Sequence, residues 1–255
     1  MATLECYQFL CQSDNYCVLV HDPETGATAA IDAPESAAVE QALATTGWTL
    51  TDILVTHCHH DHVAGIEALK SVGVTVTGPA KEASKIPGID KTVSEGDTIT
   101  LGNHTARIIE TPGHTLGHIA YWFADDALLF AGDTLFALGC GRVFEGTMEM
   151  MWASLDKIRA LPNETVAYCG HEYTAANARF AVTVDPENAA LKARAAEVDA
   201  KRAKGEPTLP TTIGLERATN PFLRADDPAI RAALGMADAS DAAVFAEIRG
   251  RKDRF

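Results

Sequence analysis

The sequence predicts a layered α/β sandwich followed by a smaller α-helical domain, and three observations support this prediction. Short apolar runs rich in β-branched or aromatic residues recur within residues 1–173. Helical patterns lie between some of these runs, and residues 174–255 contain helical patterns without strand runs. Runs of strands interspersed with helices are typical of sheets covered by helical layers. We therefore predict two domains, residues 1–173 and 174–255.

Several segments of the first predicted domain have the composition of strands. Each is short and apolar, and each is bounded by residues that favour turns. In chain order they are YCVLV, TAAID, DILVTH, VTVTGP, TARIIET, IAYWF, ALLFAGD and TVAYCGH. Helices are predicted between them at residues 34–47, 63–73 and 148–161, where Gly47, Gly73 and Pro162 mark the ends.

The second predicted domain is rich in Ala, Lys, Arg and Glu at helical spacing. Helices are predicted at residues 174–184, 187–205, 227–235 and 241–255. Residues 206–214 contain two prolines, so we predict an irregular connector there.

Composition narrows the class of protein. The chain has 255 residues, 47% hydrophobic content and a formal net charge of −14. An acidic surface repels phosphate backbones and anionic lipids, so we expect neither nucleic acid nor membrane partners. The first residues resemble no signal peptide, no apolar run is long enough to span a bilayer, and the six cysteines form no CxxC pair. We expect reduced thiols and a cytoplasmic location.

The segment THCHHDH is the strongest chemical signal in the chain. Four of the nine histidines, with one aspartate, lie within residues 57–62, between a predicted strand and a predicted helix. A lone loop histidine is usually exposed or hydrogen-bonded, but clustered imidazolium ions repel one another, and a bound cation keeps the rings neutral. We predict a metal site here, whose imidazole and carboxylate donors suit zinc, iron or manganese. The predicted ligands are His57, His59, Asp61 and His62.

Three further predicted strands also end in a polar residue that could bind a metal. TARIIET leads to His114 and His118, ALLFAGD ends in Asp133, and TVAYCGH ends in His171. A single Gly-Asp after a strand is an ordinary turn, but a repeated pattern at strand ends favours one shared site. Within the first motif, Cys58 is expected to be a packed thiol and His60 to point away.

The motifs THCHHDH, TPGHTLGH, GDTLF and CGHEY, in this order, resemble the metallo-β-lactamase superfamily. The segments AGDTLFALGCGRVFEGT, YCGHEYTAANARFA, NPFLR and RGRKD resemble the glyoxalase II (hydroxyacylglutathione hydrolase) family, over almost the whole chain. The resemblance implies a four-layer αββα sandwich with a C-terminal helical domain that binds glutathione. It also implies two divalent metal ions, with zinc expected and iron or manganese left open.

The resemblance assigns the metal ligands residue by residue. One ion would be held by His57, His59 and His114, and the other by Asp61, His62 and His171, with Asp133 bridging the two. The carboxylates of Asp61 and Asp133 would be the catalytic groups. His118 is not a ligand in this pattern, and a supporting or core role is expected for it.

The implied activity is hydrolysis of S-D-lactoylglutathione to glutathione and D-lactate, the second step of methylglyoxal detoxification. A binuclear site suits attack on a carbonyl without a serine or cysteine nucleophile. The implied partner is therefore a small-molecule glutathione thioester, and the resemblance implies a monomer.

Four residues are implied to contact the substrate: Arg142, Tyr173, Arg249 and Lys252. Arg249 and Lys252 would share a helix face and bind carboxylates, although a solvated basic tail would have the same sequence. Tyr173 would donate its hydroxyl to glutathione, unless it is a packed aromatic side chain. The family commonly has Lys at position 142 and Tyr at position 144, where this chain has Arg142 and Phe144.

Two other functions share part of this sequence pattern. A mononuclear iron persulfide dioxygenase that acts on glutathione persulfide belongs to the same superfamily, but it is expected to lack the long helical extension and the pair Arg249 and Lys252. A metal-stabilised binding module without catalysis is expected to lack some ligands, and here every expected ligand type is present.

Overall fold

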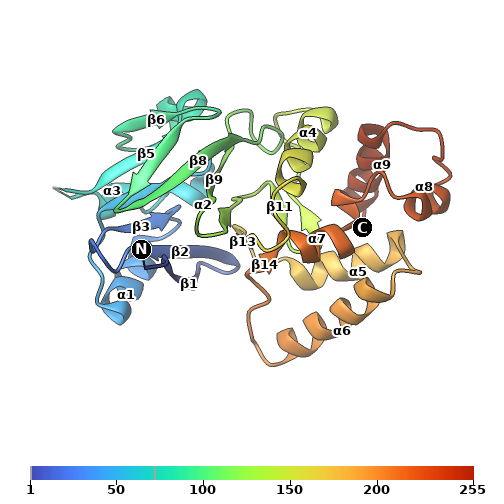
Figure 1. The fold of residues 1–255 in the computed structure, drawn as a ribbon, viewed down its shortest axis with the longest axis horizontal. Helices are drawn as coiled ribbons and strands as arrows, with labels where there is room; N and C mark the ends of the chain where they lie inside the picture. Colours follow the sequence, from blue (N-terminus) through green and yellow to red (C-terminus); the bar gives the residue numbers. More distant parts are fainter. Residues whose placement is uncertain (1, 72) are drawn as a thin grey trace. The chain divides into compact units, whose positions relative to one another are not determined.

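The computed structural model describes residues 2–71 and 73–255, which form two compact units (Figure 1). Unit 1 consists of Met1–Glu110 and Gly117–Gly132, and unit 2 consists of Thr111–Leu116 and Asp133–Phe255. This division follows spatial contacts, so the domain boundary expected at residues 173 and 174 remains a prediction.

Unit 1 contains a six-stranded mixed sheet, in the order β1 to β6. The first three strands are antiparallel, and β3 to β6 run parallel. The strands are β1 Glu5–Cys11, β2 Asn15–His21, β3 Thr28–Ile31, β4 Asp52–Leu54, β5 Thr75–Pro79 and β6 Lys91–Val93. The helices of this unit are α1 Ser36–Thr46, α2 His60–Val63, α3 Ile66–Leu69 and the 3₁₀ helix η1 Ala80–Lys85.

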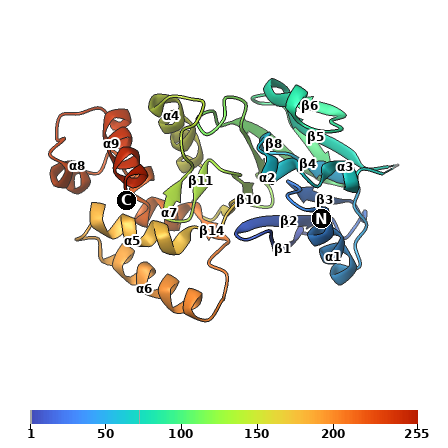
Figure 2. The same ribbon diagram turned by 180° about the vertical axis from the view of Figure 1, so that it is seen from behind.

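One face of this sheet packs against α1 and α3. Leu19, Ala30, Ile53 and Val76 pair across four neighbouring strands and therefore form one row on that face. All four are buried in the same core cluster as Val39 of α1 and the apolar side of α3. Figures 1 and 2 show α1 beside β1 and β2. The alternation of side chains along each strand thus produces the helix-covered face of the sandwich.

The remaining strands of unit 1 form an antiparallel series in the order β7, β8, β9, β10. Their bounds are β7 Thr98–Leu101, β8 His104–Glu110, β9 Ile119–Phe123 and β10 Leu128–Phe130. Tyr121 of β9 is fully buried, and its hydroxyl lies 2.9 Å from the Val55 carbonyl and 3.3 Å from that of Thr77 in β5. This hydroxyl ties the antiparallel strands to the six-stranded sheet, so unit 1 is a sandwich of two sheets with helices on one side.

Unit 2 is mainly helical. Its strands are short: β11 Leu135–Phe136 pairs with β12 Gly139–Cys140, and β13 Val166–Tyr168 pairs with β14 Thr211–Thr212. Its helices are α4 Met148–Arg159, α5 Thr174–Val184, α6 Ala189–Ala203, α7 Ile213–Thr219, η2 Pro221–Leu223, α8 Pro228–Leu234 and α9 Asp241–Asp253. Helices α5 and α6 lie side by side in both ribbon views, and α4 packs against α9 (Figures 1 and 2).

A buried ion pair organises unit 2. The carboxylate of Glu216 on α7 pairs with Arg194 on α6 and accepts hydrogen bonds from the Thr211 hydroxyl and the Leu138 main-chain N–H. Asn220 donates to the same carboxylate and to the carbonyls of the β11–β12 hairpin. Because every partner is a strong donor, the charge of Glu216 is compensated although the residue is fully buried.

Each predicted strand overlaps a strand of the structure, and the helices predicted at residues 34–47, 148–161 and 174–184 are confirmed. The prediction of one helix over residues 63–73 is wrong. Gly65 donates its N–H to Ala33, which separates α2 from α3, and Val72 lies outside the described residues.

The prediction of an irregular connector at residues 206–214 is also wrong in part. Thr211 and Thr212 form β14, and the Thr212 hydroxyl accepts a hydrogen bond from Leu215 N–H at the start of α7. Strands β1, β6 and β7 were not predicted, because their sequences mix polar and apolar residues. Among the described residues, no helix has the length and apolar character that crossing a membrane requires.

Candidate metal centre

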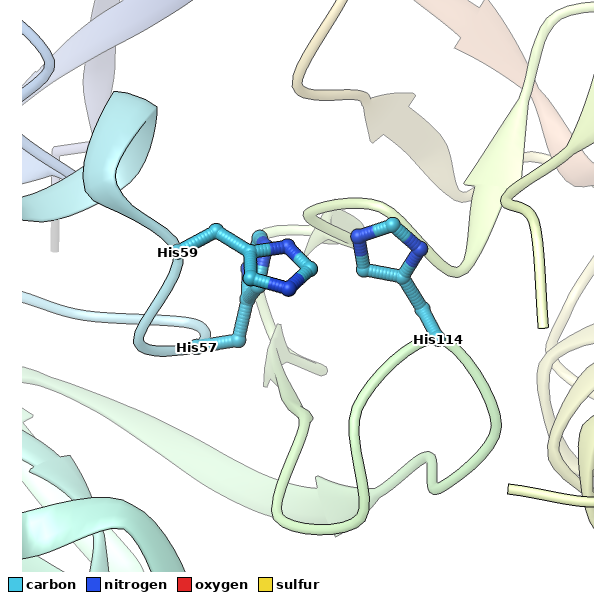
Figure 3. Close-up of side chains that lie close together, drawn as sticks. All are labelled: His57, His59 and His114. Atoms are coloured by element: carbon cyan, nitrogen blue, oxygen red, sulfur yellow. The ribbon is translucent and has the colours of Figure 1, made fainter. Parts of the chain in front are cut away.

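Two of the predicted ligands, His57 and His59, lie on the loop that follows β4 (Figure 3). The loop is held from both sides: Val55 N–H donates to Thr77 of β5, and Thr56 O accepts from Ile119 N–H of β9. His57 is fully buried, and its Nε2 lies 3.1 Å from Nδ1 of His59. Two nitrogens bound to one tetrahedral cation at about 2.0–2.1 Å would lie roughly 3.3 Å apart. The spacing therefore fits a shared metal ion.

The buried carboxylate of Asp32, directly after β3, organises this loop. Its Oδ1 accepts from Thr56 N–H at 2.7 Å, and its Oδ2 accepts from the Thr56 hydroxyl at 2.8 Å. The same Oδ2 lies 2.8 Å from Nδ1 of His62 on α2. A carboxylate accepts protons, so His62 carries its proton on Nδ1 and presents the Nε2 lone pair.

The tautomer of His57 follows from the same network. The Thr56 hydroxyl donates its one proton to Asp32, so it must accept at 3.1 Å from Nδ1 of His57. Nε2 of His57 is thus deprotonated and can bind a cation. The His57 ring also stacks on His118, with centroids 4.7 Å apart. His118 is fully buried, so its side chain supports the ligand loop from within the core.

Asp61 lies in the first turn of α2. Asn15, a buried residue at the start of β2, donates from its amide to the main-chain oxygen and to Oδ2 of Asp61, both at 3.1 Å. The same Oδ2 lies 3.9 Å from Nε2 of His62. His60, at the first position of α2, is exposed. Unit 1 therefore brings together the four predicted donors His57, His59, Asp61 and His62.

Unit 2 brings together the other three predicted ligands. His114, also labelled in Figure 3, follows β8, whereas Asp133 follows β10 and His171 follows β13. Oδ2 of Asp133 lies 3.5 Å from Nε2 of His114 and 3.3 Å from Nε2 of His171. These distances exceed the usual hydrogen-bond length of about 2.9 Å but match two donors on one cation. All three residues are buried.

Main-chain contacts orient these ligands as well. Nδ1 of His114 donates at 2.8 Å to the carbonyl of Arg142, which leaves its Nε2 free of a proton. At Gly141 a Cβ atom would lie 1.9 Å from the Asp133 carbonyl oxygen, so only glycine fits between these segments. The His171 ring stacks on Tyr173 at 4.7 Å, and Phe136 meets it edge-on. The donor set and its tautomers therefore suit a divalent metal ion.

Sequence reasoning missed three residues that hold the ligand loop: Asp32 and Thr56, described above, and Glu82, which accepts a hydrogen bond from Cys58 N–H at 2.7 Å. The signal for Asp32 was available, because TAAID ends in an aspartate directly after a strand, as ALLFAGD does. Asp32 also adopts a positive φ of 57°, which an aspartate in a plain strand would not. Thr56 and Glu82 carry no comparable pattern.

The predicted substrate contacts all lie in unit 2, and their surroundings differ. Arg142, Phe144 and Tyr173 are exposed, and the Phe144 ring lies 5.2 Å from that of His114. Arg249 is buried: it donates to the Cys140 carbonyl at 2.9 Å, pairs with Asp253 and lies over the Phe222 ring.

Lys252 lies on the same helix, α9, and is more accessible than Arg249. Its Nζ donates to the Ala176 carbonyl at 3.0 Å and lies over the rings of Phe180 and Phe255. Burial, and then the positive charges of Arg249 and its neighbours, lower the pKa of Lys252 below its usual value.

Comparison with known proteins identifies the family. The metallo-β-lactamase superfamily profile matches residues 4–171, and the profile of the hydroxyacylglutathione hydrolase C-terminus matches residues 172–255. Hydroxyacylglutathione hydrolases from Rhizobium meliloti (strain 1021) and Chelativorans sp. (strain BNC1) are 62% and 59% identical. The alignments cover 100% and 99% of this chain and 100% of each relative.

A solved structure resembles the chain over almost its whole length. ETHE1 from Myxococcus xanthus superposes with a TM-score of 0.68 and 26% identity, covering 96% of this chain and 90% of that one. Together with the family profiles, this likeness confirms the predicted α/β sandwich with a helical C-terminal part. The chain therefore belongs to the metallo-β-lactamase superfamily and, within it, to the hydroxyacylglutathione hydrolase (glyoxalase II) family.

Proposed function

We propose that the chain hydrolyses S-D-lactoylglutathione to glutathione and D-lactate, as the second step of methylglyoxal detoxification. Full-length relatives about 60% identical and named hydroxyacylglutathione hydrolase support this thioester hydrolase activity. The observation that carries the proposal is the pair of imidazole nitrogens, from His114 and His171, that face one oxygen of Asp133 at 3.5 and 3.3 Å. A carboxylate oxygen so placed suits a bridge between two cations.

The proposed ligand set has seven residues. His57, His59 and His114 would hold one ion, and Asp61, His62 and His171 the other, with Asp133 between them. The hydrogen bonds that fix the Nε2 lone pairs of His57, His62 and His114 support this assignment. We propose zinc as the native metal, and the same donors accept iron or manganese. Divalent ions held there would supply Lewis acidity toward a thioester carbonyl and lower the pKa of a coordinated water.

A carboxylate beside the proposed metal site would assist the hydrolysis. Asp61, whose side chain is 41% exposed, would help to orient the attacking water, while Asn15 holds its main chain. A thiolate leaves with little protonation, so no separate acid is required for the glutathione sulfur.

We propose that glutathione binds to the exposed residues of unit 2. Arg142 and Lys252 would attract its carboxylates, and Tyr173 would offer its hydroxyl. Arg249 would act from beneath this surface, since its guanidinium holds the Cys140 carbonyl and Asp253. Phe144 offers an apolar ring where the family commonly has a hydroxyl. Arg249 and Lys252 belong to the proposed helical domain, residues 174–255. Arg142 lies on the loop that follows β12, and Tyr173 is the last residue of the proposed first domain, residues 1–173.

The test is metal analysis and a thioesterase assay on one preparation of the purified protein. We expect two metal equivalents and release of free thiol from S-D-lactoylglutathione. Asp133→Asn should lose both metal and turnover, because the amide offers one neutral acceptor in place of a bridging carboxylate. Two bound metals without thiol release would contradict the proposed substrate, and an unchanged Asp133→Asn variant would contradict the ligand assignment.

The persulfide dioxygenase alternative is tested by oxygen uptake with glutathione persulfide, which we expect to be absent. We further propose that the enzyme is a monomer in the cytoplasm. Light scattering of the purified protein reports its mass, and fractionation of the source cells reports its location.

A further inference from the structure

Glu82 is a buried carboxylate that lies outside the proposed ligand set. It lies on η1 after β5 and is 2% exposed. Its Oε2 accepts from Cys58 N–H at 2.7 Å, and its Oε1 accepts from Gly117 N–H at 3.0 Å. Burying a carboxylate costs free energy unless strong donors compensate it, so these two hydrogen bonds are a defined feature of the fold.

Both amides belong to segments that hold a proposed ligand. Cys58 lies between His57 and His59 in the sequence, and its N–H donates a hydrogen bond to Glu82. Gly117 precedes His118, whose ring stacks on His57. Two residues further on, Ile119 N–H donates to Thr56. One carboxylate therefore joins the ligand loop to the segment that packs behind it.

The identity of residue 117 matches this arrangement. A Cβ atom at Gly117 would lie 2.5 Å from Cγ of Glu82 and 3.0 Å from its Cδ. Only glycine lets the main chain approach the carboxylate closely enough for the hydrogen bond to Oε1. The absence of a side chain at Gly117 therefore makes room for the side chain of Glu82 and for this hydrogen bond.

We infer that Glu82 is a positioning residue for the metal centre, which fixes the main chain between His57 and His59 so that both rings meet the same ion. This inference rests on the proposed function for its purpose, because it deepens the account of the same site. Glu82 acts through Cys58 N–H and touches neither substrate nor metal. A carboxylate is required because the two amides need two acceptor atoms, and a glutamine has one.

The test compares Glu82→Gln with a matched control in unit 1. Asp22 is also buried, and its carboxylate accepts from the main-chain N–H groups of Glu24 and Asn103, at the other end of β2 from Asn15. Metal-free Glu82→Gln, Asp22→Asn and wild type are titrated with Zn²⁺ against a chromophoric chelator. We expect Glu82→Gln to bind zinc about 10- to 100-fold more weakly, as is typical when an outer hydrogen-bond partner of a ligand is lost. Asp22→Asn should bind like wild type.

Two further variants separate positioning from folding. Gly117→Ala should weaken zinc binding in the same direction, because its Cβ displaces the carboxylate from the opposite side. Glu82→Asp keeps two acceptor atoms and should retain more zinc affinity than Glu82→Gln. Amide hydrogen exchange of the metal-free proteins should be faster at Cys58 in Glu82→Gln than in Asp22→Asn.

Wild-type zinc affinity in Glu82→Gln, or an equal loss in Asp22→Asn, would overturn the inference. These readouts use no substrate. A wild-type protein that binds zinc but releases no thiol from the thioester would therefore refute the proposed function and leave the role of Glu82 intact.

Discussion

At the scale of single residues, the site is defined as much by hydrogen bonds as by ligands. Asp32 and the Arg142 carbonyl decide which ring nitrogen of His62 and His114 carries the proton. Thr56 transmits the same constraint from Asp32 to His57. Because a metal binds only an unprotonated nitrogen, these contacts prepare the donors before any ion arrives.

The charge of Lys252 gives a pH-dependent prediction at this scale. Its pKa is lowered by burial and by nearby arginines, so it loses its proton at a lower pH than an exposed lysine does. If Lys252 binds glutathione as proposed, its charged form below that pKa would attract the glutathione carboxylates, and above that pKa the attraction would be lost. We therefore expect KM for S-D-lactoylglutathione to rise with pH on the alkaline side, at a pH below the ordinary lysine value, while kcat changes little.

Lys252→Met tests this assignment. It should raise KM at neutral pH and remove that alkaline rise, whereas Lys201→Met on α6 should behave like wild type. Lys201 is a suitable control because it is a partly exposed lysine paired with Glu197 on its own helix. A Lys252→Met variant with the wild-type KM profile would show that another group binds the carboxylates.

At the scale of elements, the proposed ligands follow a sequence pattern, whereas Glu82 follows none. The proposed ligands could be named from the sequence because each follows an apolar strand at its carboxyl end, and one of the motifs groups four donors in six positions. Glu82 was not predictable from sequence, because a glutamate on a short 3₁₀ helix carries no periodic signal. Its role appears only once η1 is folded against Cys58 and Gly117, which are distant in the chain.

The break between α2 and α3 has a similar cause. The local pattern favours one helix, but a tertiary hydrogen bond from Gly65 to Ala33 replaces the helical one. The helix propensity of residues 63–73 is outweighed by this contact with Ala33, just before α1. The helices at residues 148–159 and 174–184 were predicted well because their apolar spacing and end signals agree with their burial.

Helix α9 supplies a prediction at the element scale. Arg249 is buried and bonds the Cys140 carbonyl and Asp253, whereas Arg251 on the same helix is partly exposed and pairs with Glu247. Arg249→Ala should lower the free energy of unfolding by on the order of 2 kcal/mol, because a charged hydrogen bond and its packing are lost. Arg251→Ala should change it by less than about 1 kcal/mol, since exposed ion pairs contribute little.

Urea unfolding of the two variants measures this difference. Equal effects would contradict the structural role of Arg249. If Arg249→Ala also raises KM, the buried arginine supports the substrate surface from beneath, as proposed. A fall in kcat at unchanged KM would instead place Arg249 in the catalytic machinery.

At the scale of the whole molecule, the proposed metal ligands come from segments that are far apart in the sequence, so we expect metal binding and folding to be linked. Three imidazoles and a carboxylate of the proposed set lie on one loop and on α2, and two imidazoles and a carboxylate follow three strand ends. The carboxylates of Asp32 and Asp133 and the stacked rings of His57 and His118 are buried polar groups. A metal ion would compensate that polarity, so its binding free energy should add to the stability of the fold.

Removal of the metal should therefore lower the stability of the protein. A ligand that binds only the folded state stabilises it by about 2.7 kcal/mol when present at 100 times its dissociation constant. We expect dialysis against a chelator to lower Tm by several degrees and added Zn²⁺ to restore it. His59→Ala removes one donor without emptying the buried core, since His59 is only partly buried, so this variant should respond less to added Zn²⁺. Differential scanning calorimetry with and without Zn²⁺ measures both responses. If chelation leaves the Tm of the wild type unchanged, a bound cation does not contribute to the stability of the fold.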